Sequence, residues 1–339
     1  MAISAGIALL SGAMAAGAAA ITGIAIGTAF LTAFATSFVL GVALKGLTPK
    51  PNIPSGSNQA NRGYQISSRG SAQDHQIIYG QTRIGGAIIF DAVSGENNKV
   101  LHRIITFTGH EIEEFTTFYF NDEVLTLITG TDGNGDTYYR PTLATSKDGK
   151  THTRYNSYVR IYLRKGGSEN DTAILSLIQS GVGWTQDHKL QGLAYAYFRM
   201  EFEADSFPNN VPQITAILKG KKIYDPRTDT TVWSDNPALC IRDYLTNAAY
   251  GLGDLEESID DTAVTTAANV CDYYNYPTLT GVARFTLNGA FTTAVTPHDH
   301  LIDLLSAMGG LLWFGQGKWR MKAAHYVAPT VSFNEDDLR

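Results

Sequence analysis

Residues 220–246 read GKKIYDPRTDTTVWSDNPALCIRDYLT, and this stretch predicts a complete corner of the fold. A strand through Tyr224 leads directly into Asp225-Pro226-Arg227. This tripeptide is typical of a tight turn, because proline fixes its own φ and the aspartate side chain can bond the backbone beyond it. We therefore expect a strand that is followed at once by a turn.

The second half of the same stretch predicts a loop and a helix. Trp233 anchors the loop, Asn236 is a favourable N-cap, and Pro237 suits the first helical position. None of these residues supplies chemistry, so we expect them to specify architecture. The candidate structural motif consists of Tyr224, Asp225, Pro226, Arg227, Trp233, Asn236 and Pro237.

Upstream of this corner, short apolar runs bounded by glycine predict β-strands at 77–79, 87–90 and 104–107. A further strand at 115–120 runs into Asn121-Asp122, which is a hairpin signal. Two longer strands, 193–202 and 211–218, could pair with this first set. We therefore assign 76–125 and 192–232 to one β-rich domain.

Residues 126–191 read as an inserted domain, with a strand around Ile161 and a short helix that Asp171 could cap. Residues 233–339 mix helices and strands: Asp260 or Asp261 starts one helix, Thr296 caps another, and a hairpin follows. The predicted fold class is α+β and β-rich, with an inserted small domain and short helices, preceded by an apolar helical segment.

That apolar segment occupies residues 1–46, and an extended Pro/Gly linker follows at 47–75. Residues 1–44 contain no charged residue and no histidine, and their length could cross a bilayer twice. The small residues of this segment allow helices to pack closely, and Gly23 and Gly27 form a GxxxG spacing. An ordinary membrane anchor explains the same composition. The helix-packing positions are Gly12, Gly17, Gly23 and Gly27.

The net charge of −6 gives no indication of a nucleic-acid groove built on bulk positive charge, so we expect any DNA contact to be passive. Cys240 and Cys271 lack the spacing of a metal site or a disulfide framework. We interpret them as buried free thiols of a protein that folds in a reducing compartment.

Two groups of polar residues are candidate sites. Asp132, Asn134 and Asp136 have the first three ligand positions of a calcium loop, but the glycine and glutamate of that loop are missing, and a solvated turn is favoured. His298 and His300 lie in the first turn of a capped helix, where a structural role is favoured. No catalytic motif is present, so we expect no enzyme, no metal and no cofactor.

The segments 220–229, 233–246 and 250–253, together with Tyr79-Gly80 and Gly85-Gly86, resemble the hub portion of tail tip attachment proteins of long-tailed phages, the J-like proteins of lambda-type phages. The ending FNEDDLR at 333–339 resembles a junction that continues into further domains in this family. The resemblance covers most of 64–339 and is strongest in 220–253. It implies hub-type β domains and suggests that this chain is the N-terminal portion of a longer protein.

The resemblance implies a trimeric hub in the tail tip of the virion, assembled in the host cytoplasm. It would close the tail tube, link the distal tail protein ring to receptor-binding fibre domains, and open for DNA ejection. Expected partners also include the tape measure protein, other tail tip proteins, DNA that passes without specific binding, and the host membrane during ejection.

In this interpretation three apolar segments bundle in the tube lumen or wait there to enter the membrane. The alternative is a membrane-anchored bacterial protein with a β-rich extramembrane domain. A tail-associated enzyme would need a convincing carboxylate pair or zinc site, which the sequence does not offer.

Overall fold

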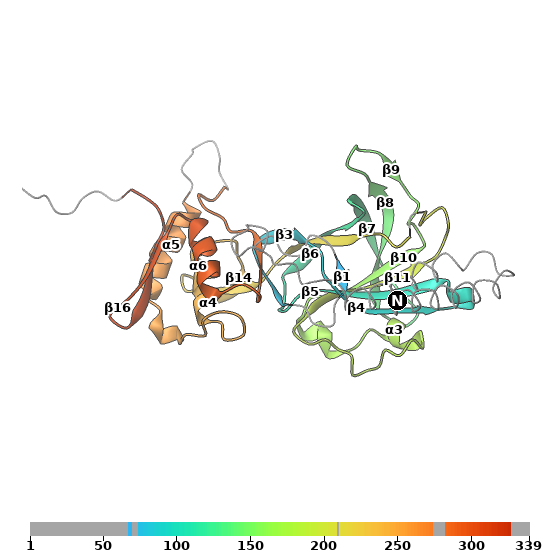
Figure 1. Cartoon of the computed structure of the whole chain (residues 1–339), viewed down its shortest axis with the longest axis horizontal. Helices are drawn as coiled ribbons and strands as arrows, with labels where there is room; N and C mark the ends of the chain where they lie inside the picture. Colours follow the sequence, from blue (N-terminus) through green and yellow to red (C-terminus); the bar gives the residue numbers. More distant parts are fainter. Residues whose placement is uncertain (1–66, 70–73, 209, 274–281, 327–339) are drawn as a thin grey trace, which may run out of the picture.

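The structure is a computed structural model, and it describes residues 67–69, 74–208, 210–273 and 282–326. The predicted apolar segment at 1–46 lies outside the described residues. The rest shows a β-rich lobe beside a smaller lobe that contains most of the helices (Figure 1). The prediction of a β-rich chain with a few short helices is confirmed.

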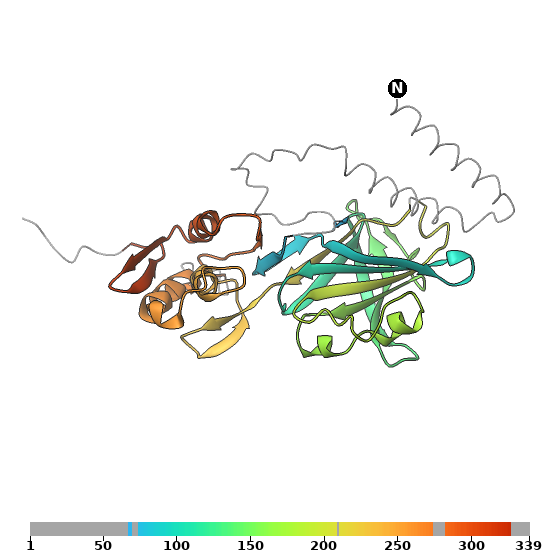
Figure 2. The ribbon, with the colours of Figure 1, turned by 60° about the horizontal axis from the view of Figure 1, so that its bottom comes forward.

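One sheet of eleven strands builds the larger lobe and curls into a half-barrel (Figure 2). Its order is β1-β4-β5-β11-β10-β8-β7-β6-β12-β3, with β9 paired to β8, and its neighbours are antiparallel except β1 and β4. The strands are β1 (Ser68–Arg69), β3 (Gln81–Ile84), β4 (Ala87–Ser94), β5 (Val100–Thr108), β6 (Glu114–Phe120), β7 (Glu123–Thr131), β8 (Thr137–Thr145), β9 (Thr151–His152), β10 (Val159–Arg164), β11 (Ala194–Glu201) and β12 (Ile214–Lys219).

The segment 126–191 contributes β8, β10 and most of β7 to this sheet, where they lie between β6 and β11. It also contains the short helices η2 (Ser168–Asp171) and α3 (Leu175–Gln179). The prediction that Asp171 caps a helix is wrong: the N-cap of α3 is Ile174, and the Asp171 carboxylate instead accepts a hydrogen bond from Gln191. A further short helix, η1 (Glu96–Asn98), connects β4 to β5.

The predicted hairpin at Asn121-Asp122 is confirmed between β6 and β7. Both turn residues have positive φ, 48° and 67°, which is the conformation of a two-residue turn that matches the twist of antiparallel strands. Asparagine and aspartate tolerate this region better than other side chains that carry a Cβ. The local sequence therefore fixes the register of this strand pair.

Each face of the sheet has its own apolar core. Alternate residues of β10, Val159 and Ile161, pack on the inner face with the phenylalanines of β6. Tyr162 and Tyr197 lie on the other face, where they pack against Ile174 and Leu177 of the α3 region. This alternation follows from the two-residue period of a strand.

The smaller lobe packs three helices with two-stranded ribbons. All three helices begin as predicted, with the side chains of Asn236, Asp260 and Thr296 each accepting a hydrogen bond from a backbone N–H of the first turn. The elements are β13 (Lys222–Asp225), β14 (Thr230–Trp233), α4 (Pro237–Thr246), η3 (Glu256–Ser258), α5 (Asp261–Asp272), α6 (Pro297–Ser306), β16 (Leu311–Gly315) and β17 (Lys318–Lys322).

A ribbon formed by β2 (Gln76–Tyr79) and β15 (Gly289–Thr292) connects the two lobes. Ile78 packs into the core of the sheet lobe, whereas Ile77 and Tyr79 pack into the core of the helix lobe. Side chains alternate between the faces of a strand, so this one ribbon serves both cores. The two apolar cores therefore meet along this ribbon.

Candidate functional site: the polar junction of the helix lobe

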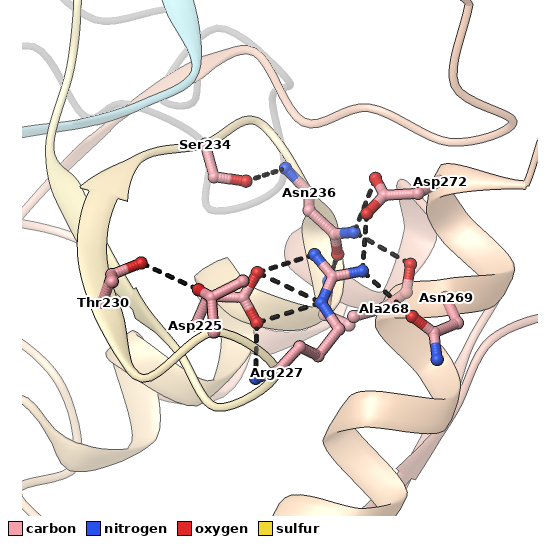
Figure 3. A network of polar contacts seen from close by, with 10 residues as sticks. Asp225, Arg227, Thr230, Ser234, Asn236, Ala268, Asn269 and Asp272 are labelled. Atoms are coloured by element: carbon pink, nitrogen blue, oxygen red, sulfur yellow. Dashed lines mark hydrogen bonds and ion pairs between the residues drawn. The ribbon is translucent and has the colours of Figure 1, made fainter.

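Arg227 connects the β13–β14 turn to helix α5 (Figure 3). Its guanidinium donates to Asp225 at 2.7 Å and to Asp272 at 2.7 Å, and it also reaches Asn269 at 3.1 Å. Burial favours a raised pKa for Asp225, but hydrogen bonds from the side chain and backbone of Arg227 outweigh it and lower that pKa. The pKa of Arg227 is raised, chiefly by its hydrogen bonds to Asp225.

Asn236 does more than cap α4. Its side-chain oxygen accepts from the backbone N–H of Ala238 at 3.0 Å, as an N-cap does. Its amide nitrogen donates to the carbonyl of Ala268 at 3.0 Å and to Asp272 at 2.9 Å (Figure 3). Asp272 thus accepts from both Arg227 and Asn236, and α4, α5 and the turn become one polar unit.

The remaining aromatic residues of the predicted motif extend the unit. The Tyr224 ring lies under the guanidinium of Arg242, 4.6 Å from its centre, and Arg242 in turn pairs with Asp261 at the start of α5. Trp233 donates from its indole N–H to the carbonyl of Gly80 at 3.2 Å. The structure therefore brings the predicted motif together at one corner, and Trp233 links that corner to the chain beside β2.

A second polar group lies where the two lobes meet, and sequence reasoning missed it. The Asp243 carboxylate of α4 accepts hydrogen bonds from Tyr79 at 2.6 Å and from Tyr250 at 2.7 Å, and it pairs with Lys221 at 3.0 Å. Lys221 also donates to the Tyr250 hydroxyl. Burial and the neighbouring Asp243 raise the pKa of both tyrosines, so both hydroxyls stay protonated as donors.

The backbone beside Lys221 holds the lobes in close contact. Lys221 N–H donates to the Ile78 carbonyl at 2.8 Å, and Gly220 N–H donates to the Gly80 carbonyl at 2.8 Å. A Cβ at Gly220 would lie 2.0 Å from the Ile78 oxygen, so only glycine fits here. The signal in the sequence was the glycine-lysine pair that opens the 220–246 stretch.

His110 supports the same strand from the other side. Its Nε2 accepts the Ile78 N–H at 2.9 Å, which leaves Nδ1 to donate to the Glu111 carbonyl at 2.7 Å. Burial lowers the pKa of His110 to about 4, and nearby Lys221 contributes in the same direction. A neutral imidazole is the form that can make both hydrogen bonds.

The other two candidate groups have structural partners. The Asp132 loop forms the turn between β7 and β8, and Asp132 accepts from Tyr162 at 2.9 Å and from the N–H groups of Asn134 and Asp136. The Ser176 hydroxyl donates to Asp132, and its backbone N–H donates to Asp136 at 2.8 Å. In the first turn of α6, buried His300 contacts the Thr292 carbonyl at 3.0 Å.

Both cysteines are buried and free, as predicted, and burial raises the pKa of Cys271 to about 11. Within the described ranges, no three of His, Cys, Asp and Glu gather as a metal site would require. A cavity of about 300 Å³ lies between α5 and the β16–β17 hairpin, and its lining includes Ala267, Trp313 and Met321.

In the part of the chain that the structure describes, every helix is too short or too polar to span a bilayer. The predicted helix-packing positions Gly12, Gly17, Gly23 and Gly27 lie outside the described residues. The membrane or lumen role of that segment therefore stays a prediction.

Comparison with protein families finds none that matches the chain. The sequence is 23% identical over 312 residues to the baseplate hub protein pb3 of Escherichia phage T5. The aligned region covers 76% of this chain and 33% of pb3. The chain thus spans about a third of the length of this relative. A chain in the virion of the native gene transfer agent particle is similar in structure at a TM-score of 0.43 and 15% identity, covering 88% of this chain and 65% of that one.

Proposed function

We propose that this chain is a structural hub protein of a phage tail. The observation that carries the proposal is the weak homology to the baseplate hub protein pb3, which extends over most of this chain. The 220–253 stretch adds support, because its residues build a structural corner of the kind that a scaffold requires. Backbone hydrogen bonds at Gly220 and Lys221 and the Tyr79–Asp243 hydrogen bond also join the β-rich lobe to the helix lobe, which suits a rigid building block.

The finer proposal is a hub of the tail tip, of the J-like type. In it, three copies surround the DNA channel, contact the distal tail protein ring and the tape measure protein, and lead to the domains that bind the host. The apolar segment at 1–46 would lie in the lumen as a bundle or enter the host membrane at ejection. The resemblance in 220–253 supports this version.

We further propose that the role is architectural and not catalytic. Asp243, Asp272 and Asp132 belong to the sites described above, and each accepts hydrogen bonds from neighbouring protein groups. Such carboxylates orient elements and are poorly placed to act on a substrate. Turnover of cell-wall material by the purified chain would overturn this part.

The test is the location of the protein in purified particles. Mass spectrometry of gradient-purified virions and immunogold labelling should find the chain at the tip of the tail, in about three copies relative to a tail protein of known stoichiometry. A knockout of the gene should yield particles without a complete tip. Recovery of the chain in cell membranes and its absence from virions would support the membrane-anchored alternative and overturn the proposal.

A further inference from the structure

Three arginines lie side by side on the outer face of the large sheet. Arg160 of β10 is in direct register with Arg199 of β11. Strands β8 and β10 pair at Tyr139 and Ile161, so Arg140, the next residue of β8, lies beside Arg160, the preceding residue of β10. These arginines point away from the core that holds Val159 and Ile161, because side chains alternate along a strand.

Part of the same face is covered by the α3 region, and the three arginines lie next to this covered part. The row next to them, Tyr162 and Tyr197, is buried against Ile174 and Leu177. The arginines themselves are only partly covered, and the side chain of Arg199 retains 28% of its exposure. All three arginines are therefore partly exposed at the border of the covered region.

This arrangement is unfavourable without a partner. Like charges directly opposite each other on neighbouring strands destabilise a sheet. Glu201 is the nearby carboxylate, 3.6 Å from Arg199, but it also pairs with Lys99 at 3.2 Å. Among the residues that the structure describes, no carboxylate lies within ion-pair distance of Arg140 or Arg160. The row thus carries excess positive charge in a chain whose net charge is −6.

The contacts that the arginines do make hold them in place and leave their charge unneutralised. Arg140 donates to the Asn156 side chain at 2.7 Å, and Arg160 lies over the Tyr138 ring at 4.8 Å. His102 continues the row on β5, opposite Arg199. Burial and the charge of Arg199 lower the pKa of His102 to about 4, so this histidine is neutral at pH 7.

We propose that Arg140, Arg160 and Arg199 form a binding strip for the phosphate groups of DNA. A guanidinium group can bind two oxygens of one phosphate through two parallel hydrogen bonds. Three arginines on neighbouring strands span about 10 Å. A duplex presents one charge per about 1.7 Å of its axis, so several phosphates face such a strip. The inference rests on the proposed function, which places DNA beside this protein. For this reason we favour DNA over an acidic protein as the ligand of the strip.

The experiment measures binding of the full chain, in non-ionic detergent, to a fluorescein-labelled duplex of mixed sequence across a series of salt concentrations. The test variant is Arg140→Gln/Arg160→Gln/Arg199→Gln. The control, Lys147→Gln/Lys318→Gln/Lys322→Gln, removes the same charge from exposed positions away from the strip. We expect the slope of log K against log salt to fall by about 2.7 in the test variant, and affinity at low salt to fall at least about tenfold. The control should change either value much less.

Equal losses in the two variants would overturn the proposal, because the effect would then be that of net charge alone. Displacement of the duplex by polyglutamate at equal charge concentration would also overturn it and assign the strip to an acidic protein. If the triple variant does not fold, Arg160→Gln alone should lower the slope by about 0.9. None of these results depends on where the chain lies in the virion, so a failed strip and a failed hub assignment are distinguishable.

Discussion

At the scale of single residues, Arg227 is the member of the corner whose loss would leave two carboxylates without their cation. Arg227→Ala would leave Asp225 and Asp272 without their shared cation, and the Asp225 side chain is 11% exposed. We expect the free energy of unfolding to fall by about 2–3 kcal/mol, because a buried carboxylate that loses its partner keeps its desolvation cost. Denaturant titration would measure this. The exposed Lys147→Ala should change stability by less than about 0.5 kcal/mol, and a similar result for Arg227→Ala would contradict the role given to it.

The buried His110 leads us to expect that the stability of the fold depends on pH. Its pKa is about 4 in the folded protein and near 6.5 in the unfolded chain, so the unfolded chain binds the extra proton between these values. Stability should therefore fall as pH drops from about 6.5 to 4, by up to about 3 kcal/mol from this group. Denaturation at a series of pH values would show the slope.

A His110→Gln variant will be less stable at every pH, but its stability should depend less steeply on pH in this window. The matched control is His298→Gln, which removes an exposed histidine of α6. Equal slopes in the two variants would show that His110 titrates as an ordinary histidine.

Residues with local partners were predictable, and those with distant partners were not. Asp225 and Asn236 bond the backbone two residues ahead, and such contacts follow from residue type and spacing. Tyr79 and Asp243 are 164 positions apart, and Asp243 looks like any polar residue of a helix. Only the packing of the two lobes brings them together.

At the scale of elements, the helix starts were predictable because the cap and the proline lie within the same few residues. Asn236 and Thr296 are matched in this respect, since each is followed by proline at the first helical position. They differ in their tertiary contacts, because Asn236 also donates to Ala268 and Asp272.

The comparison of these two caps gives a prediction. Thr296→Ala should cost about 1 kcal/mol, the usual value for an exposed cap. Asn236→Ala should cost about 3 kcal/mol, because two further hydrogen bonds, the one to Ala268 fully buried, are lost with the cap. Thermal and denaturant unfolding of the two variants would test this. Equal losses would mean that the contacts to α5 contribute little.

The order of the strands in the sheet could not be predicted from local sequence patterns. Strands β7, β8 and β10 read as a separate insertion because a polar loop interrupts them, yet they pair with β6 and β11. The arginine strip was missed for the same reason. Its members are on three strands that are far apart in sequence, and only the strand order places their charges in one row.

At the scale of the whole molecule, the two lobes depend on a contact between backbones at Gly220. The chain there donates to Gly80 and Ile78 from consecutive N–H groups, and this brings Lys221 to Asp243. A side chain at Gly220 would push against a carbonyl, which cannot move aside in the way that a flexible side chain can.

We therefore expect Gly220→Ala to lower the free energy of unfolding by about 3 kcal/mol or more, and to weaken the cooperativity between the lobes. Gly133→Ala is the matched control, because a Cβ there meets no atom within 4 Å. Both substitutions reduce the entropy of the unfolded chain alike, so their difference isolates the contact with Ile78. Separate unfolding transitions in the Gly220 variant, followed by tryptophan fluorescence and hydrogen exchange, would show that this contact joins the lobes into one cooperative unit. A single, unshifted transition would show that the β2–β15 ribbon alone is sufficient.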